Sequence, residues 1–139
     1  MHQVCRPLDI VWSDLIREKT FYYGVLVKLL FIVSLFPVIQ EDWFVPFIVN
    51  WIEQPFSFPW SNHLLNEGDP LAFPYGPIMF IYHLPSTLIG WLIDNTFSLN
   101  YFTNFGFRLS LFFADIFLLL LLLQLFENHW KKVIIYYWL

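Results

Sequence analysis

The feature that most constrains the fold is the apolar run LSLFFADIFLLLLLLQLF, residues 109–126, which contains a single charged side chain, Asp115. At about 1.5 Å per helical residue, a run of about 18 residues extends for about 27 Å, close to the thickness of the hydrocarbon core of a bilayer. Two other apolar runs, residues 22–39 and 77–93, have a similar length. A helix satisfies the backbone hydrogen bonds of such a run within the segment itself. The sequence therefore predicts an all-α integral membrane protein.

The composition supports the same class. Of the 139 residues, 58% are hydrophobic, 22% are aromatic and 13% are charged, whereas soluble domains carry about 25% charged residues. Trp and Tyr favour membrane–water interfaces. The net charge of −4 provides no basic patch, which excludes nucleic acid as a partner. A single cysteine, Cys5, excludes an intramolecular disulfide and is either a free thiol or a palmitoylation site.

The hydropathy pattern predicts about three transmembrane helices and the start of a fourth. The last apolar stretch, VIIYYWL, has about seven residues, too few to cross a bilayer. We therefore expect the chain to be part of a longer polytopic protein. The predicted segments are a cytoplasmic amphipathic N-terminal segment (1–21), a first transmembrane helix (22–39), an external loop with interfacial helices (40–76), a second transmembrane helix (77–93), a polar loop (94–108), a third transmembrane helix (109–126), and a loop with the truncated start of a further span (127–139).

The basic residues indicate an orientation. Arg6, Arg17, Lys19 and Lys28 flank the N-terminal side of the first span, whereas residues 40–76 carry acids but no Lys or Arg. By the positive-inside rule, the N-terminus is cytoplasmic and this loop lies outside or in a lumen. The expected location is a bacterial plasma membrane or the membrane of the endoplasmic reticulum.

Residues 40–76 form a loop that is too long for a simple connection and too aromatic for a disordered one. Residues 46–54 are predicted to form a short helix, because Pro is tolerated in a first helical turn and Pro55 ends the helix. A second short helix is predicted over residues 61–66, with Ser61 as its N-cap. The first of these helices has an apolar stripe, so it is expected to lie along the bilayer surface. The loop is thus predicted to be an ordered external cap.

The acidic pair Glu41 and Asp42 follows the end of the first apolar run. One interpretation is that these acids mark the membrane–water interface and bind water. In the other, Asp42 faces a cavity between the first span and the cap helix, where a carboxylate partly desolvated by Trp43 accepts a proton from a sugar or lipid hydroxyl. Successive helical residues point about 100° apart, so only one of the two acids is expected to point inward.

Glu53, His63 and Tyr75 are the candidates for substrate binding in the same loop. A lone loop histidine is most often a hydrogen-bonding group at the surface. A divalent metal is the cofactor candidate, held by His63 together with Asp42, Glu53, Glu67 and Asp69, but no spacing is diagnostic and no metal ligands are assigned.

Three ionisable residues fall within the predicted spans: Lys28, His83 and Asp115. Lys28 lies near the start of its span and can extend its amine to the lipid headgroups. Asp115 is either protonated, bonded to His83, or paired with a basic residue of a further helix. Intramembrane ionisable groups are costly and take functional or pairing roles, and a structural polar link between helices is the favoured interpretation for Asp115.

A span that ends in an acid, an aromatic amphipathic helix, and the segment NEGDPLAFPYGPIM before a second span follow one another in this chain. Gly68, Asp69, Pro70 and residues 73–77 carry the match, and RLSLFFADIFLLLLLL places an Asp near the start of a Leu-rich helix. This order resembles the GT-C superfamily of polytopic membrane glycosyltransferases over most of residues 20–139.

The resemblance implies transfer of a sugar from a polyprenyl-phosphate-linked donor to a lipid, glycan or protein acceptor. It assigns the catalytic carboxylate to Asp42, with Glu41 as the second choice. The carboxylate takes the proton of the acceptor hydroxyl, and the leaving lipid phosphate needs a cation, which residues 40–76 do not contain. Such enzymes have many more spans, so we expect this chain alone to be inactive. The alternative is a non-catalytic polytopic membrane protein, a transporter fragment or an assembly subunit, whose external cap binds a partner or membrane lipid.

Overall fold

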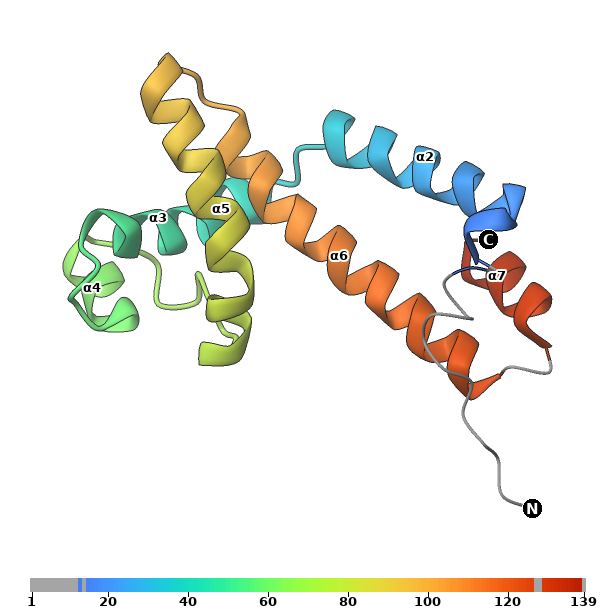
Figure 1. The fold of residues 1–139 in the computed structure, drawn as a ribbon. Helices are drawn as coiled ribbons and strands as arrows, with labels where there is room; N and C mark the ends of the chain where they lie inside the picture. The colour runs from blue at the N-terminus through green and yellow to red at the C-terminus, as the bar shows by residue number, and fades with distance from the viewer. Residues whose placement is uncertain (1–12, 14, 127–128, 139) are drawn as a thin grey trace. The chain divides into compact units, whose positions relative to one another are not determined.

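The computed structural model describes residues 13, 15–126 and 129–138, and every regular element in these residues is helical (Figure 1). Cys5 and most of the predicted amphipathic segment 1–21 lie outside the described residues. The chain divides into two compact units. The central unit is Ile32–Leu111, and the terminal unit comprises the described parts of Met1–Phe31 and Phe112–Leu139.

The first helix, α2 (Lys19–Ser34), is shorter at its C-terminal end than the predicted span 22–39. Residues 35–37 are not helical. Pro37 explains the early end, because a proline lacks the amide proton that continues a helix and disfavours helical geometry in the residue before it.

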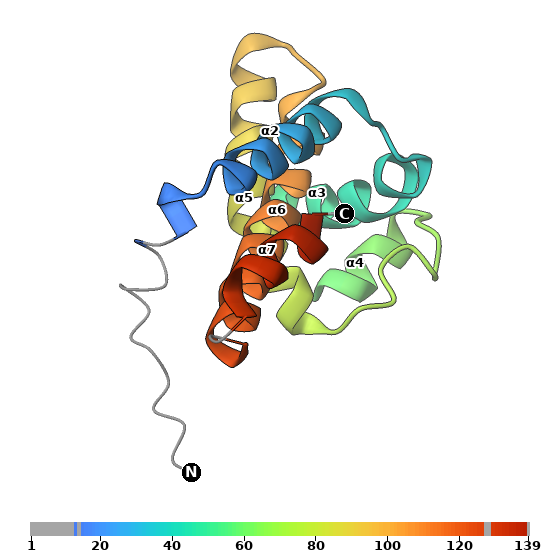
Figure 2. The same cartoon turned by 90° about the vertical axis from the view of Figure 1, so that its right-hand side faces the viewer.

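The cap segment of the central unit contains η1 (Gln40–Phe44), which is a π-helix, followed by α3 (Val45–Glu53) and α4 (Pro59–Leu65). Helix α3 confirms the predicted helix 46–54 to within one residue at each end. The prediction for α4 was wrong in its start: Phe58 is the N-cap and Pro59 opens the helix, so Ser61 is not the N-cap. A proline is favoured at a first helical position, where its missing amide proton costs nothing. Helix α3 packs against η1, α4 and α5 (Pro77–Phe97) (Figures 1 and 2).

Helix α6 (Phe102–Leu125) starts well before the predicted residue 109, so most of the predicted loop 94–108 is helical. Ser98, in the left-handed conformation (φ 55°), ends α5. The carboxylate of Asp94 then accepts hydrogen bonds from the amides of Phe102 (2.9 Å) and Thr103 (2.7 Å), which have no partner within α6 itself. The end of α5 therefore caps the start of α6, and the loop shrinks to residues 98–101.

The backbones of α5 and α6 come into close contact at two glycines of the central unit. A Cβ atom on Gly90 would lie 2.0 Å from the carbonyl oxygen of Phe102, and one on Gly106 would lie 2.2 Å from that of Ser86. Small residues at such crossings allow helices to approach closely, as is common in membranes. The apolar core of this unit lies beside the crossing and contains Val45, Phe47, Ile48, Phe73, Phe80 and Phe107.

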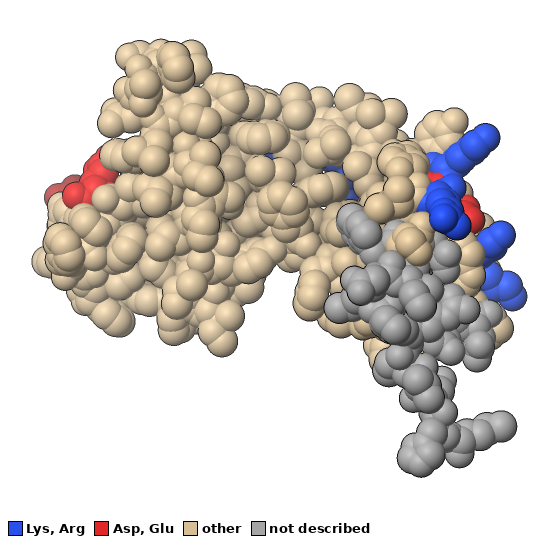
Figure 3. Space-filling view, viewed as in Figure 1, with Lys and Arg blue, Asp and Glu red and all other residues tan. Residues whose placement is uncertain are grey.

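The terminal unit contains α7 (Trp130–Trp138), the part of α2 up to Phe31 and the part of α6 from Phe112. Its core consists of Leu15, Phe21, Leu119, Leu123 and Ile134. Most Lys and Arg side chains of this unit gather at the start of α2 and on α7, whereas Lys28 lies further along α2 (Figure 3). Lys131 on α7 lies 4.0 Å from Glu18, which directly precedes α2. Positive charge is therefore concentrated at one end of the unit.

Of the described helices, only α6 is long and apolar enough to cross a membrane. Helix α2 has 16 residues, and α5, although 21 residues long, contains the polar residues His83, Thr87 and Asp94. The all-helical fold is thus confirmed, whereas the number of predicted spans, about three, is not.

Candidate functional site

Gln40, the first residue of η1, fixes this π-helix to the start of α6 within the central unit. Its side chain is buried, and Nε2 donates to the backbone carbonyl of Asn104 at 2.9 Å and to Oδ1 of Asn104 at 3.2 Å. Glu41 and Asp42 follow immediately in η1. The position of the acidic pair is therefore tied to α6 and not only to its neighbours in the sequence.

Arg108, on the second turn of α6, is the cation of this site. Only 5% of its surface is exposed. Nε donates to the Asn104 carbonyl at 3.2 Å, Nη1 donates to the carbonyl of Leu35, and the guanidinium lies over the ring of Phe36 at 4.6 Å. Nη2 is buried and has no hydrogen-bond partner among the described residues. Glu41 interacts electrostatically with the guanidinium.

The two acids differ in environment. Glu41 is half-buried, whereas Asp42 is exposed. Among the described residues, none forms a hydrogen bond or an ion pair with the carboxylate of Asp42. The expectation that Trp43 partly desolvates Asp42 was therefore wrong, because η1 turns this side chain toward solvent. Glu41 is the member of the pair that lies near a buried charge.

The structure does not join the three predicted substrate-binding residues to the acids. Glu53 is exposed at the end of α3. Tyr75 packs its ring against Phe44 at 5.6 Å, and is half exposed. No hydrogen bond or ion pair joins Glu53, His63 or Tyr75 to either acid within the described part of the chain. These residues remain predictions for substrate binding.

His63 is a buried residue of α4 rather than a surface one. Its Nδ1 accepts a hydrogen bond from the amide of Asn50 at 2.9 Å, while Nε2 has no partner among the described residues. Burial lowers the pKa of the imidazole below its ordinary value of 6.5, against a smaller opposing effect of Asp69. Gly68 is required beside it, because a Cβ there would lie 2.2 Å from Nε2. His63 thus joins α3 to α4 as a neutral group.

No group of three His, Cys, Asp or Glu side chains that could hold a metal ion occurs in the residues that the structure describes. His63 does not form such a group with Asp42, Glu53, Glu67 or Asp69, and its Nδ1 is bonded to Asn50 instead. A divalent metal therefore has no ligand set in this part of the chain.

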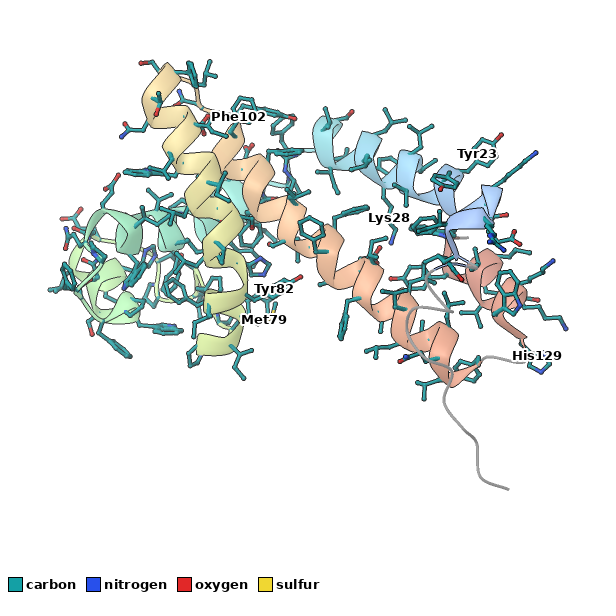
Figure 4. The ribbon with its side chains drawn as sticks, in the orientation of Figure 1. Tyr23, Lys28, Met79, Tyr82, Phe102 and His129 are labelled. Carbon is teal, nitrogen blue, oxygen red and sulfur yellow. The ribbon has the colours of Figure 1, made fainter. Side chains whose placement is uncertain are left out.

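The ionisable residues of the apolar segments have partners. In the terminal unit, Lys28 extends from α2 and forms an ion pair with Asp115 on α6 (Figure 4). The Tyr137 hydroxyl of α7 donates to the same carboxylate at 2.6 Å. His83, in the central unit, bonds to Ser110 instead of Asp115. Asp115 thus links three helices, and its basic partner comes from this chain.

Sequence reasoning assigned no role to Gln40, Asn104 or Arg108. Their contacts join residues far apart in the sequence, so no local spacing predicts them. One signal was available: Arg108 is a lone cation at the start of an apolar run, which is a costly position unless the charge has a purpose. In the structure Glu41 interacts electrostatically with Arg108, a positive charge of the kind that residues 40–76 lack.

Comparisons of this chain with protein-family models, with curated proteins and with solved structures gave no match.

Proposed function

We propose that this chain is part of a membrane glycosyltransferase that transfers a sugar from a polyprenyl-phosphate-linked donor to a hydroxyl acceptor. The observation that carries the proposal is the buried Arg108, which has a free Nη2 and lies within electrostatic reach of Glu41. A reaction of this class needs a carboxylate for the acceptor proton and a cation for the leaving phosphate. Both are found where η1 meets α6.

Within this proposal, Asp42 is the base. Its carboxylate has no partner among the described residues, so both oxygens are free to accept the proton of an acceptor hydroxyl. Glu41 instead balances the charge of Arg108, since it interacts with the guanidinium. Nη2 is the guanidinium nitrogen left to donate to a phosphate oxygen of the donor once a movement of the surrounding residues exposes it, and the planar guanidinium suits this recognition geometrically.

The membrane location is part of the same proposal. Helix α6 is the one described helix with the length and composition of a span, and we propose that the apolar segments 22–39 and 77–93 also lie in or on the bilayer. A lipid-linked donor is confined to the membrane, so the acids must lie close to the bilayer surface. Their place directly after an apolar segment supports this.

The test is the change Asp42→Asn in the chromosomal gene, followed by an assay of isolated membranes with tritiated polyprenyl-phosphate-linked hexoses. We expect transfer to fall by about 10²–10⁴-fold, the usual contribution of a positioned general base. Glu67→Gln, an exposed acid in the turn after α4, is the control and leaves transfer unchanged. Near-normal transfer by Asp42→Asn at equal membrane abundance would show that the catalytic assignment of Asp42 is wrong.

A further inference from the structure

A cavity of about 540 Å³ opens in the central unit where the turn between α5 and α6 meets α3. This volume lies within the range of about 300–1,000 Å³ that is usual for small-molecule sites. The side chains that matter for the argument are Trp91, Asn95, Ser98, Asn100, Thr103 and Asn104.

The wall of this cavity offers no free charge. Asp94 is its one ionisable residue. The Asp94 carboxylate accepts four hydrogen bonds, from the amides of Tyr101, Phe102 and Thr103 and from the Thr103 hydroxyl. Because these bonds use both oxygens to cap α6, the carboxylate is not available for a cation. Neither Lys nor Arg lines the cavity, so nothing in it selects a phosphate.

Most of the polar side chains that remain free are amides, and Ser98 adds a hydroxyl. The side chains of Asn95 and Asn100 are exposed, and neither bonds to another residue in the described part of the chain. Asn104 receives a hydrogen bond from Gln40 on its Oδ1, which leaves its amide nitrogen available to a ligand. A carboxamide both donates and accepts hydrogen bonds, and so does a hydroxyl group. Several amides around a cavity therefore match a ligand with several hydroxyls.

Trp91 adds an apolar surface to the same cavity. Its side chain is half-buried, so part of the indole faces the open space. A pyranose has an apolar face of C–H groups and an edge of hydroxyls, and a flat aromatic side chain beside free amides complements both. An ionic ligand would find no free opposite charge in this cavity.

We propose that this cavity binds an uncharged saccharide, with the ring against Trp91 and the hydroxyls bonded to Asn95, Asn100 and Asn104. Binding follows from the cavity alone, whereas its use in a transfer reaction rests on the proposed function. Asn104 connects the two, since it bonds to Gln40, the residue before the acids, and its carbonyl accepts from Arg108.

The experiment is a titration of the purified chain with methyl β-glucoside and maltose, read by saturation-transfer NMR. The protein is held in a detergent without a sugar headgroup, so that the detergent does not occupy the cavity. We expect saturable binding of the neutral sugars and no stronger binding of glucose 6-phosphate. Asn100→Ala and Trp91→Leu should each weaken binding by about fivefold or more, the loss expected for one hydrogen bond or a similar contact.

Glu67→Gln, at an exposed residue of the turn after α4, is the control and should leave binding unchanged. Asn100 is exposed in the turn, so its substitution leaves the fold intact even where Trp91→Leu does not. The proposal would be overturned if the Asn100→Ala variant bound the neutral sugars as tightly as the wild type does. It would also be overturned if glucose 6-phosphate bound more tightly than the neutral sugars. Asp42→Asn should bind sugar normally, so loss of transfer and loss of binding are separable.

Discussion

Arg108 is a buried residue that is held rigidly and still has one unpaired donor. Two of its nitrogens donate to backbone carbonyls, and the ring of Phe36 covers one face of the guanidinium. These contacts fix the charge in a buried position, while Nη2 keeps its hydrogen-bonding capacity. A buried donor without a partner is costly, about 1–3 kcal/mol. A ligand with an anionic oxygen would remove this cost.

His63 gives a pH-dependent contribution to stability. Because its folded-state pKa is lowered below 6.5, the unfolded chain binds the proton more readily than the folded one. The free energy of unfolding should therefore be highest above pH 6.5 and fall as the pH decreases from 6.5 toward the lower folded-state pKa.

Thermal unfolding of the detergent-solubilised protein at pH values from about 7.5 to about 5, on either side of the ordinary histidine pKa, measures this change in stability. The His63→Gln variant should lose part of the decrease below pH 6.5. The same change at exposed His129 should retain it. An identical pH profile for wild type and His63→Gln would show that His63 is not a buried neutral group.

At the scale of elements, some boundaries were predictable and others were not. Pro46 and Pro55 bracket α3, so local sequence defines its ends. The start of α6 was missed because its cap, Asp94, comes from the preceding helix and not from the residues next to Phe102. The close contacts at Gly90 and Gly106 were missed for the same reason, since a glycine alone does not identify the backbone that approaches it.

The crossing of α5 and α6 makes a prediction about Gly106. Ala is the better helix former by about 1 kcal/mol, but its Cβ would lie 2.2 Å from the carbonyl oxygen of Ser86. A backbone atom cannot move aside as a flexible side chain can. We expect Gly106→Ala to reduce the free energy of unfolding by about 1–3 kcal/mol, the usual cost of overpacking.

Gly76→Ala is the matched control, because no atom lies within 4 Å of the added Cβ. Denaturant unfolding monitored by circular dichroism compares the two variants. If Gly106→Ala were as stable as Gly76→Ala, α5 and α6 would not cross in close contact.

At the scale of the whole molecule, the contacts of the central unit bear on membrane topology. Three full crossings would put residues 40–76 and 94–108 on opposite faces of the bilayer. Gln40 nevertheless bonds to Asn104, and Val49 lines the same cavity as Asn95 and Asn100. Two segments in contact lie at the same depth, so we infer that α5 does not separate them by a full crossing.

Cysteine labelling tests this inference in intact cells or sealed vesicles. Cys5 is the single native cysteine, so Cys5→Ser provides the background for Glu53→Cys and Asn100→Cys. Both introduced positions are exposed. A membrane-impermeant maleimide should label both from the same side. Labelling of the two positions from opposite sides would support the three-span topology and would contradict the contact between Gln40 and Asn104.

The position of the acidic pair was predictable from the sequence, whereas its neighbour Arg108 was not. The sequence placed Glu41 and Asp42 at the end of an apolar segment, where the structure has them in η1. The missing cation could not be found, because Arg108 approaches η1 only through the packing of α6 against residues 35–40. Long-range contacts of this kind depend on the fold as a whole, and short motifs do not contain them.

The central claim is that the acids of η1 and Arg108 form one transfer site. The most direct measurement compares Arg108→Lys and Arg108→Gln in membranes of equal protein abundance, assayed with tritiated polyprenyl-phosphate-linked hexoses. We predict that Arg108→Gln lowers transfer by about 10²–10³-fold, the loss expected for a charge-stabilising donor, and that Arg108→Lys, which keeps the charge, recovers part of it. Equal transfer by wild type and Arg108→Gln would contradict the account.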